Sequence, residues 1–469
     1  MPNYIFYDFE TTGLSHGYDQ VLQFAAIATD ENMRELPEAS IDIRCRLLPH
    51  IVPSPIALSV TNVGPDLLIN QDLSNREFMH AIEEWSKQWG KSVFLGYNSI
   101  KFDENMMRHG LYQTLHAPYL TNTNGNTRAD VMRLAHAAYL FDPEALKIPL
   151  SSKGRPVFKL GILAAENGIV FDEDEAHDAL YDVRKTIELA EFIKNKVPDV
   201  WNTMLFNSTK NNAINFISEQ DVFAAGDMFY NNPYRWIMTG CGTNSNNSAE
   251  KAAFDLSHSP DEYMDLSVEE LVDVLNQRSK IIRPIRTNAQ PFISNANAVS
   301  QEYWDNANVI KEEAIERAQI IKSNLEFQSR VGQALANRYE DDGEESPHVE
   351  DKIYGGFPSN ADSALMEKFH QSTPEQRLQM LNQFEDTRYK QIARRLVYFE
   401  TPEVLPNNLR AKMSSWVNER LNAEDEVPWR TLSEAVAELD ELKQDKGEND
   451  PLLQEIESFL NDLTQDMAA

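Results

Sequence analysis

The sequence predicts an α/β fold with a mixed sheet for about its first 200 residues, then a small β-rich region and a C-terminal helical region. Three observations predict this order. Short apolar runs alternate with amphipathic helical stretches before residue 200, short β-like runs between Asn, Ser and Gly turns follow from residue 222, and helical spacing with Pro and Gly breaks dominates after residue 350. A chain of 469 residues exceeds the usual size of one domain. We therefore place three domains, at residues 1–200, 201–350 and 351–469.

Composition indicates a globular protein that is strongly acidic. The formal net charge is −31, which disfavours non-specific adhesion to nucleic acid. Charges farther apart than about 8 to 10 Å are largely screened at physiological salt, so a basic groove can still act on an acidic body. Much of the acidity lies late in the chain, around Asp341 and from Glu434 onward. We interpret these runs as solvated surface.

Targeting signals and cysteine pairs are not evident. The N-terminus runs directly into an apolar strand pattern, and no apolar stretch is long enough to cross a bilayer. Cys45 and Cys241 lie far apart without a CxxC partner, so neither a disulfide framework nor a zinc site is indicated. We expect a cytoplasmic protein that acts as a monomer, without a membrane partner.

The first strand pattern, YIFYDFETTGL from Tyr4 to Leu14, carries two carboxylates near its end. Side chains alternate along a strand, so Asp8 and Glu10 project from one face, about 7 Å apart along the chain. Two like charges on an apolar strand need compensation, and a divalent cation is the commonest answer. An ordinary strand end with solvated acids would show the same residues. Further ligands elsewhere in the chain are therefore needed to distinguish a metal site from such a strand end.

The elements that follow lead to a third acid. Strands are expected at Val21–Asp30 and Ile41–Pro49, and a helix at Asn75–Trp89. The buried run VFLGYN (93–98) leads to Asp103, and residues 104–110 have helical spacing. Asp103 is therefore expected at a helix N-terminus, where negative charge is favoured.

A fourth acid lies in AHDALYDVRKTIELAEFI, residues 176–193. Asp178 is a plausible N-cap for a helix that opens at Ala179, which places Asp182 in the first turn. His177 and Asp182 would lie roughly 140° apart on one continuous helix, so they converge only if His177 belongs to the preceding loop. A lone His is more often structural or exposed, but the neighbouring acid favours a catalytic role.

Together these residues suit one kind of chemistry. Four carboxylates provide the oxygen ligands that Mg²⁺ or Mn²⁺ prefers, and two ions about 3.5 to 4 Å apart can clamp a phosphodiester. A nearby imidazole, with an ordinary pKa near 6.5, can accept the proton of an attacking water. Metal-assisted hydrolysis of phosphodiesters is the expected reaction.

The motifs resemble those of the DEDDh 3′-to-5′ exonucleases, and more narrowly the bacterial exodeoxyribonuclease I family. The resemblance is carried by DFETTG from Asp8, by GYNSIKFD from Gly96 and by the His177-x-x-x-x-Asp182 spacing. It implies an RNase H-like exonuclease domain, an SH3-like β-rich domain and a C-terminal helical domain. The implied metal ligands, for two Mg²⁺ ions with Mn²⁺ as an alternative, are Asp8, Glu10, Asp103 and Asp182.

The same resemblance implies further roles. His177 would be the general base, and Thr11, Val60 and Thr61 would lie near the 3′-terminal nucleotide, with Asn98 as another substrate contact. Relatives dock the acidic, apolar tail of the single-stranded-DNA-binding protein, which one basic patch of this chain could also bind.

After Val200 the sequence predicts secondary structure but no further catalytic residues. Residues 201–212 resemble a hinge, short strands follow from Val222, and an amphipathic helix is expected at Leu266–Gln277, with Leu271, Val272 and Leu275 inward. The third region should contain helices, expected at residues 363–369, 373–382, 385–397, 408–422 and 432–444.

Basic residues gather in two places against the acidic background. The first set is Lys147, Lys153, Arg155 and Lys159, with Phe158 placed to stack on bases; the second is Arg278, Lys280, Arg283 and Arg286. We expect Lys153, Arg155, Phe158, Lys159, Arg283 and Arg286 to contact a single strand. Solvated loops or ion pairs with surplus carboxylates would explain the same pattern.

The leading hypothesis is a metal-dependent exonuclease that releases deoxynucleoside 5′-monophosphates from the 3′ end of single-stranded DNA during repair and recombination. One alternative is a DEDDh exonuclease that acts mainly on RNA or as a proofreading subunit. Another is a catalytically silent nucleic-acid-binding protein. The long second and third regions disfavour an RNA-directed or proofreading exonuclease. Four clustered carboxylates, which repel phosphate without metal, disfavour a silent nucleic-acid-binding protein.

Overall fold

The computed structural model describes residues 3–172, 175–338 and 346–465. The expected acidic run around Asp341 lies outside these residues. The first 206 residues contain β1 (Asn3–Thr11), β2 (Val21–Thr29), β3 (Glu35–Arg44), α1 (Pro55–Thr61), α2 (Pro65–Ile69), α3 (Asn75–Lys87), β4 (Ser92–Gly96), α4 (Asp103–Gln113), a 3₁₀ turn (Leu120–Asn122), β5 (Thr127–Asp130), α5 (Val131–Phe141), α6 (Leu160–Glu166), α7 (Ala179–Lys196) and α8 (Pro198–Phe206).

The first sheet is mixed, with strand order β3-β2-β1-β4-β5. β1 pairs antiparallel with β2 and parallel with β4, and β4 pairs parallel with β5. The carboxyl ends of β1, β4 and β5 therefore meet at one edge, where side chains from separate segments can converge. The predicted mixed α/β fold is confirmed.

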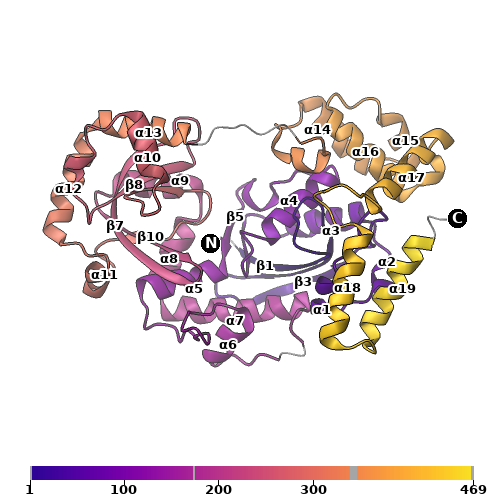
Figure 1. The fold of residues 1–469 in the computed structure, drawn as a ribbon, viewed down its shortest axis with the longest axis horizontal. Helices are drawn as coiled ribbons and strands as arrows, with labels where there is room; N and C mark the ends of the chain where they lie inside the picture. The colour runs from indigo at the N-terminus through magenta and orange to yellow at the C-terminus, as the bar shows by residue number, and fades with distance from the viewer. Residues whose placement is uncertain (1–2, 173–174, 339–345, 466–469) are drawn as a thin grey trace.

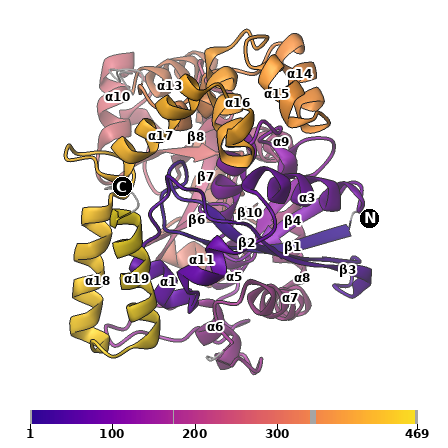
Figure 2. The same ribbon diagram turned by 90° about the vertical axis from the view of Figure 1, so that its right-hand side faces the viewer.

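Helices cover both faces of this sheet (Figures 1 and 2). Apolar side chains of α5 and α7 bury one face, including Tyr4 and Phe6 of β1. Side chains of α3 and α4 bury the other, including Tyr7 and Phe9. A strand buried on both faces is expected to be apolar at nearly every position, so the acids at the end of β1 depart from its pattern.

The second region contains a five-stranded antiparallel sheet, in the order β10-β6-β7-β8-β9. Its elements are α9 (Lys210–Glu219), β6 (Phe223–Phe229), β7 (Asn232–Thr243), β8 (Glu250–Asp255), a 3₁₀ turn (Pro260–Glu262), α10 (Val268–Asn276), β9 (Ile282–Arg286), β10 (Ile293–Asn295), α11 (Gln301–Asn306), α12 (Lys311–Ser323) and α13 (Leu325–Asn337). The expected strands are confirmed, and the SH3-like likeness stays a prediction.

Three expectations for this region are corrected. The predicted hinge at residues 201–212 lies mostly within α8 and α9, because apolar side chains such as Trp201 and Ala213 bury one side of each helix. In α10 the inward residues are Leu271, Val274 and Leu275, whereas Val272 is only partly buried. The helices α11 to α13 make the region more helical than the β-rich pattern predicts.

The third region is helical, as expected. It contains the 3₁₀ segment η3 (Val349–Tyr354), α14 (Asn360–His370), α15 (Pro374–Met380), α16 (Thr387–Glu400), a 3₁₀ turn (Pro402–Val404), α17 (Asn407–Leu421), α18 (Leu432–Lys446) and α19 (Pro451–Gln465). The sequence pattern does not predict α19, which pairs with α18 and contacts α1 and α2 (Figure 1). The three domain boundaries stay predictions.

Contacts fix the later regions on the first sheet. Arg133 of α5 donates from Nε and Nη2 to the carbonyl of Gln290, at 3.2 and 2.9 Å, and its guanidinium lies 4.1 Å from the centre of the Phe292 ring. On the other side, apolar residues of α1, α2, α18 and α19 form one buried cluster. None of the described helices is long and apolar enough to cross a lipid bilayer.

Candidate active site

Asp8 and Glu10 lie on the face of β1 that α5 and α7 cover. Phe6, two residues before Asp8, is buried in the core on this face, whereas Phe9 packs into the core on the opposite face. Because side chains alternate along a strand, the surface that is apolar at Phe6 carries carboxylates at positions 8 and 10. Both carboxylates are half-buried at the strand end.

Asp103 is held against the end of β1 by a backbone hydrogen bond. β4 pairs with β1 as far as Phe6 and Leu95, and beyond that point Asp103 Oδ1 accepts a hydrogen bond from the Phe9 N–H at 3.3 Å. Asp103 is the first residue of α4 and is buried. Gly96 allows the close approach, since a Cβ there would lie 2.8 Å from the carbonyl oxygen of Tyr7.

Asp130, at the end of β5, is a residue that the sequence analysis missed. It is fully buried, caps the N-terminus of α5, and accepts hydrogen bonds from the N–H groups of Asn98 and Ile100 at 3.0 and 3.2 Å. It thereby holds the loop in which Asn98 adopts a left-handed φ of 62°. The sequence contains a pattern that could have indicated Asp130. The run TRAD precedes an apolar helical run, so its Asp is another acid between a strand and a helix.

Asp182 lies in the first turn of α7, as predicted. The helix begins at Ala179, and the Asp178 side chain caps it by accepting from the Tyr181 N–H at 3.1 Å. Asp182 Oδ1 is buried and has no hydrogen-bond partner. A buried, unsatisfied carboxylate oxygen is costly, so this atom calls for a ligand.

His177 precedes the cap of α7, in the loop that the sequence analysis required. Its backbone φ is 66°, in the left-handed region, and its side chain is exposed. Burial raises the pKa of Asp182, and the charge and backbone N–H of His177 oppose this rise, which places the two residues close together.

The four acids act on one another electrostatically. Burial, followed by the charges of Asp103, Glu10 and Asp182, raises the pKa of Asp8 well above its ordinary value. Burial and then Asp182 and Asp103 raise the pKa of Glu10 to about 8. The pKa of Asp103 rises to about 8 and that of Asp182 to about 6, in both cases chiefly through burial. Residues separated by more than 170 positions in sequence therefore share one electrostatic site.

Arg44 on β3 partly balances this charge and was also missed. It lowers the pKa of Glu10, and its Nη2 lies 4.0 Å from Asp178 Oδ2. No local pattern indicates this role, because Arg44 reaches the acids only through the β1-β2-β3 register, in which Glu10 faces Gln23 and Gln23 faces Arg44.

The donor set suits oxygen-seeking divalent cations. All four residues offer carboxylates, the ligands that Mg²⁺ and Mn²⁺ prefer, and the unsatisfied Asp182 Oδ1 lacks any other partner. No three of the four bring their oxygens within 4.8 Å of one another; in the part of the chain that the structure describes, only His80, Glu83 and His116 form so compact a set.

Glu10→Gln is expected to stabilise the cation-free protein at alkaline pH. The folded-state pKa of Glu10, about 8, lies above its ordinary 4.5, so ionisation costs stability as pH rises from about 4.5 through about 8. In a chelator at pH 8.5 the free energy of unfolding of the variant should exceed that of the parent by on the order of 1 kcal/mol or more. At pH 4.5 the two should agree. Glu424→Gln, at an exposed position, is the control, and a Glu10→Gln variant less stable than the parent at pH 8.5 would contradict the assignment.

The predicted contacts for the 3′-terminal nucleotide lie at the end of β1 and along α1. Thr11 Oγ1 donates to the carbonyl of Gly13 at 2.7 Å and fixes the turn. The Ser54 N–H donates to the carbonyl of Thr12 at 2.8 Å, which ties the start of α1 to the same turn. Val60 and Thr61 end this helix, and the Val60 side chain is about half exposed.

The first basic set is only partly as predicted. Lys147, Lys153, Arg155 and Lys159 are exposed, and no ion pair joins them to a carboxylate among the described residues. The expectation for Phe158 is wrong: the ring is 4% exposed and lies edge-on to His136 at 4.2 Å, so it is part of the core and not available to stack on a base.

One member of the second basic set, Arg283, lies beside aromatic rings that the sequence pattern did not single out. Arg283 on β9 places its guanidinium 3.7 Å from the centre of the Trp236 ring, and Trp236 stacks with Tyr234 at 6.0 Å. Arg286, at the end of β9, is exposed. The alternation of Tyr234 and Trp236 in YRW is the signal that could have found them.

Comparisons with known proteins agree with this arrangement. A family model described as "Exonuclease" matches residues 5–190, and one described as "Exonuclease I C-terminal domain" matches residues 347–463. Exodeoxyribonuclease I of Haemophilus influenzae is 24% identical over 97% of this chain and 98% of its own length. The corresponding protein of Escherichia coli is 24% identical over 79% of this chain and 80% of its own.

Three solved structures are similar along nearly the whole chain. An exonuclease I from Methylocaldum szegediense has a TM-score of 0.83 at 23% identity, covering 99% of this chain and 100% of its own. E. coli exonuclease I with a dA16 oligonucleotide has a TM-score of 0.85 at 21% identity, with the same coverage. A structure described as SSB/Exonuclease I in complex with the inhibitor CFAM has a TM-score of 0.82 at 21% identity, again with that coverage. At these identities the structures support the fold.

Proposed function

The chain belongs to the exonuclease I family and is a nuclease, and from this premise we propose that it removes deoxynucleoside 5′-monophosphates one at a time from the 3′ end of single-stranded DNA. The observation that carries the proposal is the electrostatic coupling of Asp8 with Glu10, Asp103 and Asp182 at one sheet edge. A protein that only binds nucleic acid gains nothing from four carboxylates that repel phosphate.

We assign two Mg²⁺ ions, with Mn²⁺ as a substitute, to Asp8, Glu10, Asp103 and Asp182. When bound, the ions supply Lewis-acid activation of a water and stabilise the charge that develops on the leaving oxygen. His177 accepts the proton of that water, because its side chain is exposed and close enough to Asp182 to interact with it electrostatically. Asp130 holds the loop that contains Asn98, and Asp103 holds the end of β1.

We assign the route of the DNA strand to the two basic sets. Lys153, Arg155 and Lys159 are exposed cations without ion-pair partners in the described chain, and unpaired cations are suited to phosphate contacts. Trp236 and Tyr234 offer stacked rings beside Arg283, Arg286 is exposed at the end of the same strand, and aromatic stacking is how single strands are held without regard to sequence.

The partner and compartment complete the proposal. One similar structure is described as SSB/Exonuclease I, and we assign the acidic tail of the single-stranded-DNA-binding protein to one of the two basic sets. Cys45 and Cys241 are both unpaired and buried, which fits the reducing bacterial cytoplasm. The protein should act as a monomer.

Labelled single-stranded DNA, duplex DNA and RNA, each with Mg²⁺ and with chelator, test the activity. Mononucleotides should leave the 3′ end of single-stranded DNA only when Mg²⁺ is present. Faster degradation of RNA would favour an RNA-directed enzyme, and binding without cleavage would favour the silent binding protein.

Arg286→Glu should weaken binding of single-stranded DNA in chelator. The reversed charge removes about one phosphate contact, so the slope of log affinity against log salt should fall by about 1. Fluorescence anisotropy over a salt series measures this, with Arg184→Glu, another exposed arginine, as the control. Equal slopes for the parent and Arg286→Glu would remove this residue from the strand route.

A further inference from the structure

A second cluster of metal-binding residue types lies at the other end of α4 from the acids. His80 and Glu83 stand three residues apart on α3, a spacing that puts them on one face, and His116 follows the end of α4. One ligand atom from each of the three lies within 4.8 Å of the others. They line a cavity of about 740 Å³, together with His370 at the end of α14.

The hydrogen bonds of His116 leave one ring nitrogen free to bind a metal. Thr114 Oγ1 has a single proton and donates it to the carbonyl of Gly110 at 2.7 Å. It also lies 2.9 Å from His116 Nδ1, so the imidazole is the donor there and Nε2 carries a lone pair. Nε2 is buried without a hydrogen-bond partner, in a side chain that is 6% exposed. This is how metal-ligating histidines are usually held, with the far nitrogen donating.

His370 shows the same arrangement. Its Nε2 lies 3.1 Å from the carbonyl of Leu115, which can only accept, so Nε2 carries the proton and Nδ1 the lone pair. Nδ1 is buried and has no hydrogen-bond partner. The rings of His116 and His370 stack at 3.9 Å. Two buried imidazole lone pairs without partners therefore lie beside one cavity.

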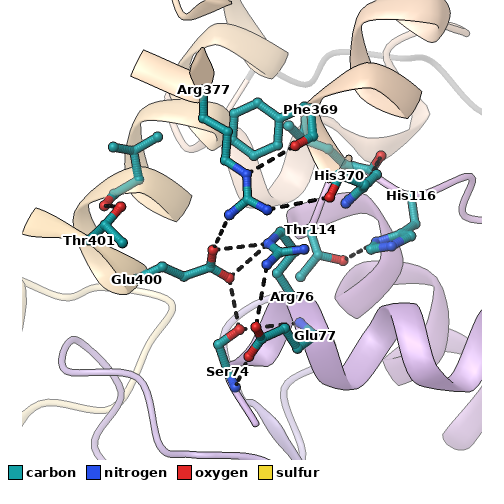
Figure 3. A network of polar contacts seen from close by, with 12 residues as sticks. Ser74, Arg76, Glu77, Thr114, His116, Phe369, His370, Arg377, Glu400 and Thr401 are labelled. Carbon is teal, nitrogen blue, oxygen red and sulfur yellow. Dashed lines mark hydrogen bonds and ion pairs between the residues drawn. The ribbon is translucent and has the colours of Figure 1, made fainter. Parts of the chain in front are cut away.

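A network of ion pairs fixes the elements that carry these residues (Figure 3). Glu400 accepts from Arg76 of α3 at 2.8 Å and from Arg377 of α15 at 2.7 Å. Arg377 also donates to the backbone carbonyls of Phe369 and His370. Glu400 thus balances the positive charges of the two arginines. The same contacts fix α3 and α14 relative to each other.

We propose that His80, Glu83 and His116 bind one Zn²⁺ or a similar transition-metal ion, with His370 or water as the fourth ligand. Two imidazoles and one carboxylate suit zinc, whereas the all-carboxylate site suits Mg²⁺. Lys87, 3.3 Å from Glu83, is the charge that the ion must displace. Bound there, the ion joins α3 to the loop after α4 beside α14, and so strengthens the junction between the first sheet and the C-terminal helices.

Cobalt titration of an Asp8→Asn, Asp182→Asn protein, in which the acidic site is disabled, tests the proposal. One Co²⁺ per chain should bind with the intense visible absorption of a four-coordinate ion and be displaced by Zn²⁺. His80→Gln changes an exposed side chain, so it should fold, and it should weaken binding by more than about tenfold. Thr114→Val, which touches no metal, should weaken it by about 10- to 100-fold by releasing His116.

A control variant and a stability measurement separate a specific zinc site from unspecific binding. His258→Gln, at another exposed histidine, is the matched control and should bind like the parent. In the Asp8→Asn, Asp182→Asn protein, which is the parent here, Zn²⁺ should raise the melting temperature, since an ion that binds the folded state stabilises that state. The same protein with His80→Gln should show no rise. No four-coordinate absorption in the parent, or equal affinity in parent and His80→Gln, would overturn the proposal. Neither result would touch the nuclease assignment.

Discussion

Asp182→Asn lowers the rate of 3′ nucleotide release from single-stranded DNA by at least about a thousandfold. Asp182 Oδ1 is buried without a hydrogen-bond partner, and an amide keeps the shape of the side chain while removing the charge that a cation would need. Loss of several kcal/mol of metal-derived stabilisation corresponds to a factor of this size. Release of labelled mononucleotides at saturating Mg²⁺ measures it.

The matched control is Asp199→Asn, which changes an exposed acid in the first turn of α8. It should keep the parental rate, because the helix position is equivalent but the carboxylate is remote from the site. Binding of single-stranded DNA in chelator should be unchanged or tighter in Asp182→Asn, since one negative charge is gone. A rate within tenfold of the parent would show that Asp182 holds no essential ion.

Glu350→Ala is expected to cause the largest loss of stability, about 3 to 5 kcal/mol. Glu350 is 1% exposed and accepts from Arg395 of α16 at 2.9 Å and from Arg420 of α17 at 2.6 Å. Its removal leaves two guanidinium groups buried without their counter-charge. Denaturant unfolding of both proteins measures the loss.

Glu326→Ala provides the comparison, because Glu326 pairs with Arg330 at the surface. Exposed pairs contribute about 0 to 1 kcal/mol, so this variant should be nearly as stable as the parent. A loss below about 1 kcal/mol for Glu350→Ala would show that the arginines find other partners or water.

The sequence was most informative where local chemistry determines structure. Alternation along β1 placed Asp8 and Glu10 on one face, and the cap at Asp178 correctly located the start of α7 and Asp182 within it. These features depend on neighbours in the chain, so they can be read without tertiary contacts.

Features set by tertiary contacts were missed or misassigned. In the sequence, Phe158 resembles an exposed aromatic residue beside lysines, but its side chain is buried in the core of the first sheet. Arg44 meets Glu10 only through strand register, and Asp130 reaches the Asn98 loop only because β4 and β5 are neighbours. The His80, Glu83 and His116 cluster combines one helix face with a loop more than 30 residues later, and no spacing rule connects them.

Manganese titration followed by electron paramagnetic resonance decides whether the four acids form a single two-ion site. If they do, the parent protein at saturating Mn²⁺ gives the spectrum of an exchange-coupled pair, and Asp182→Asn gives only isolated ions. A parent spectrum of isolated ions alone, or a coupled signal that persists in Asp182→Asn, would contradict a shared site built from Asp8, Glu10, Asp103 and Asp182.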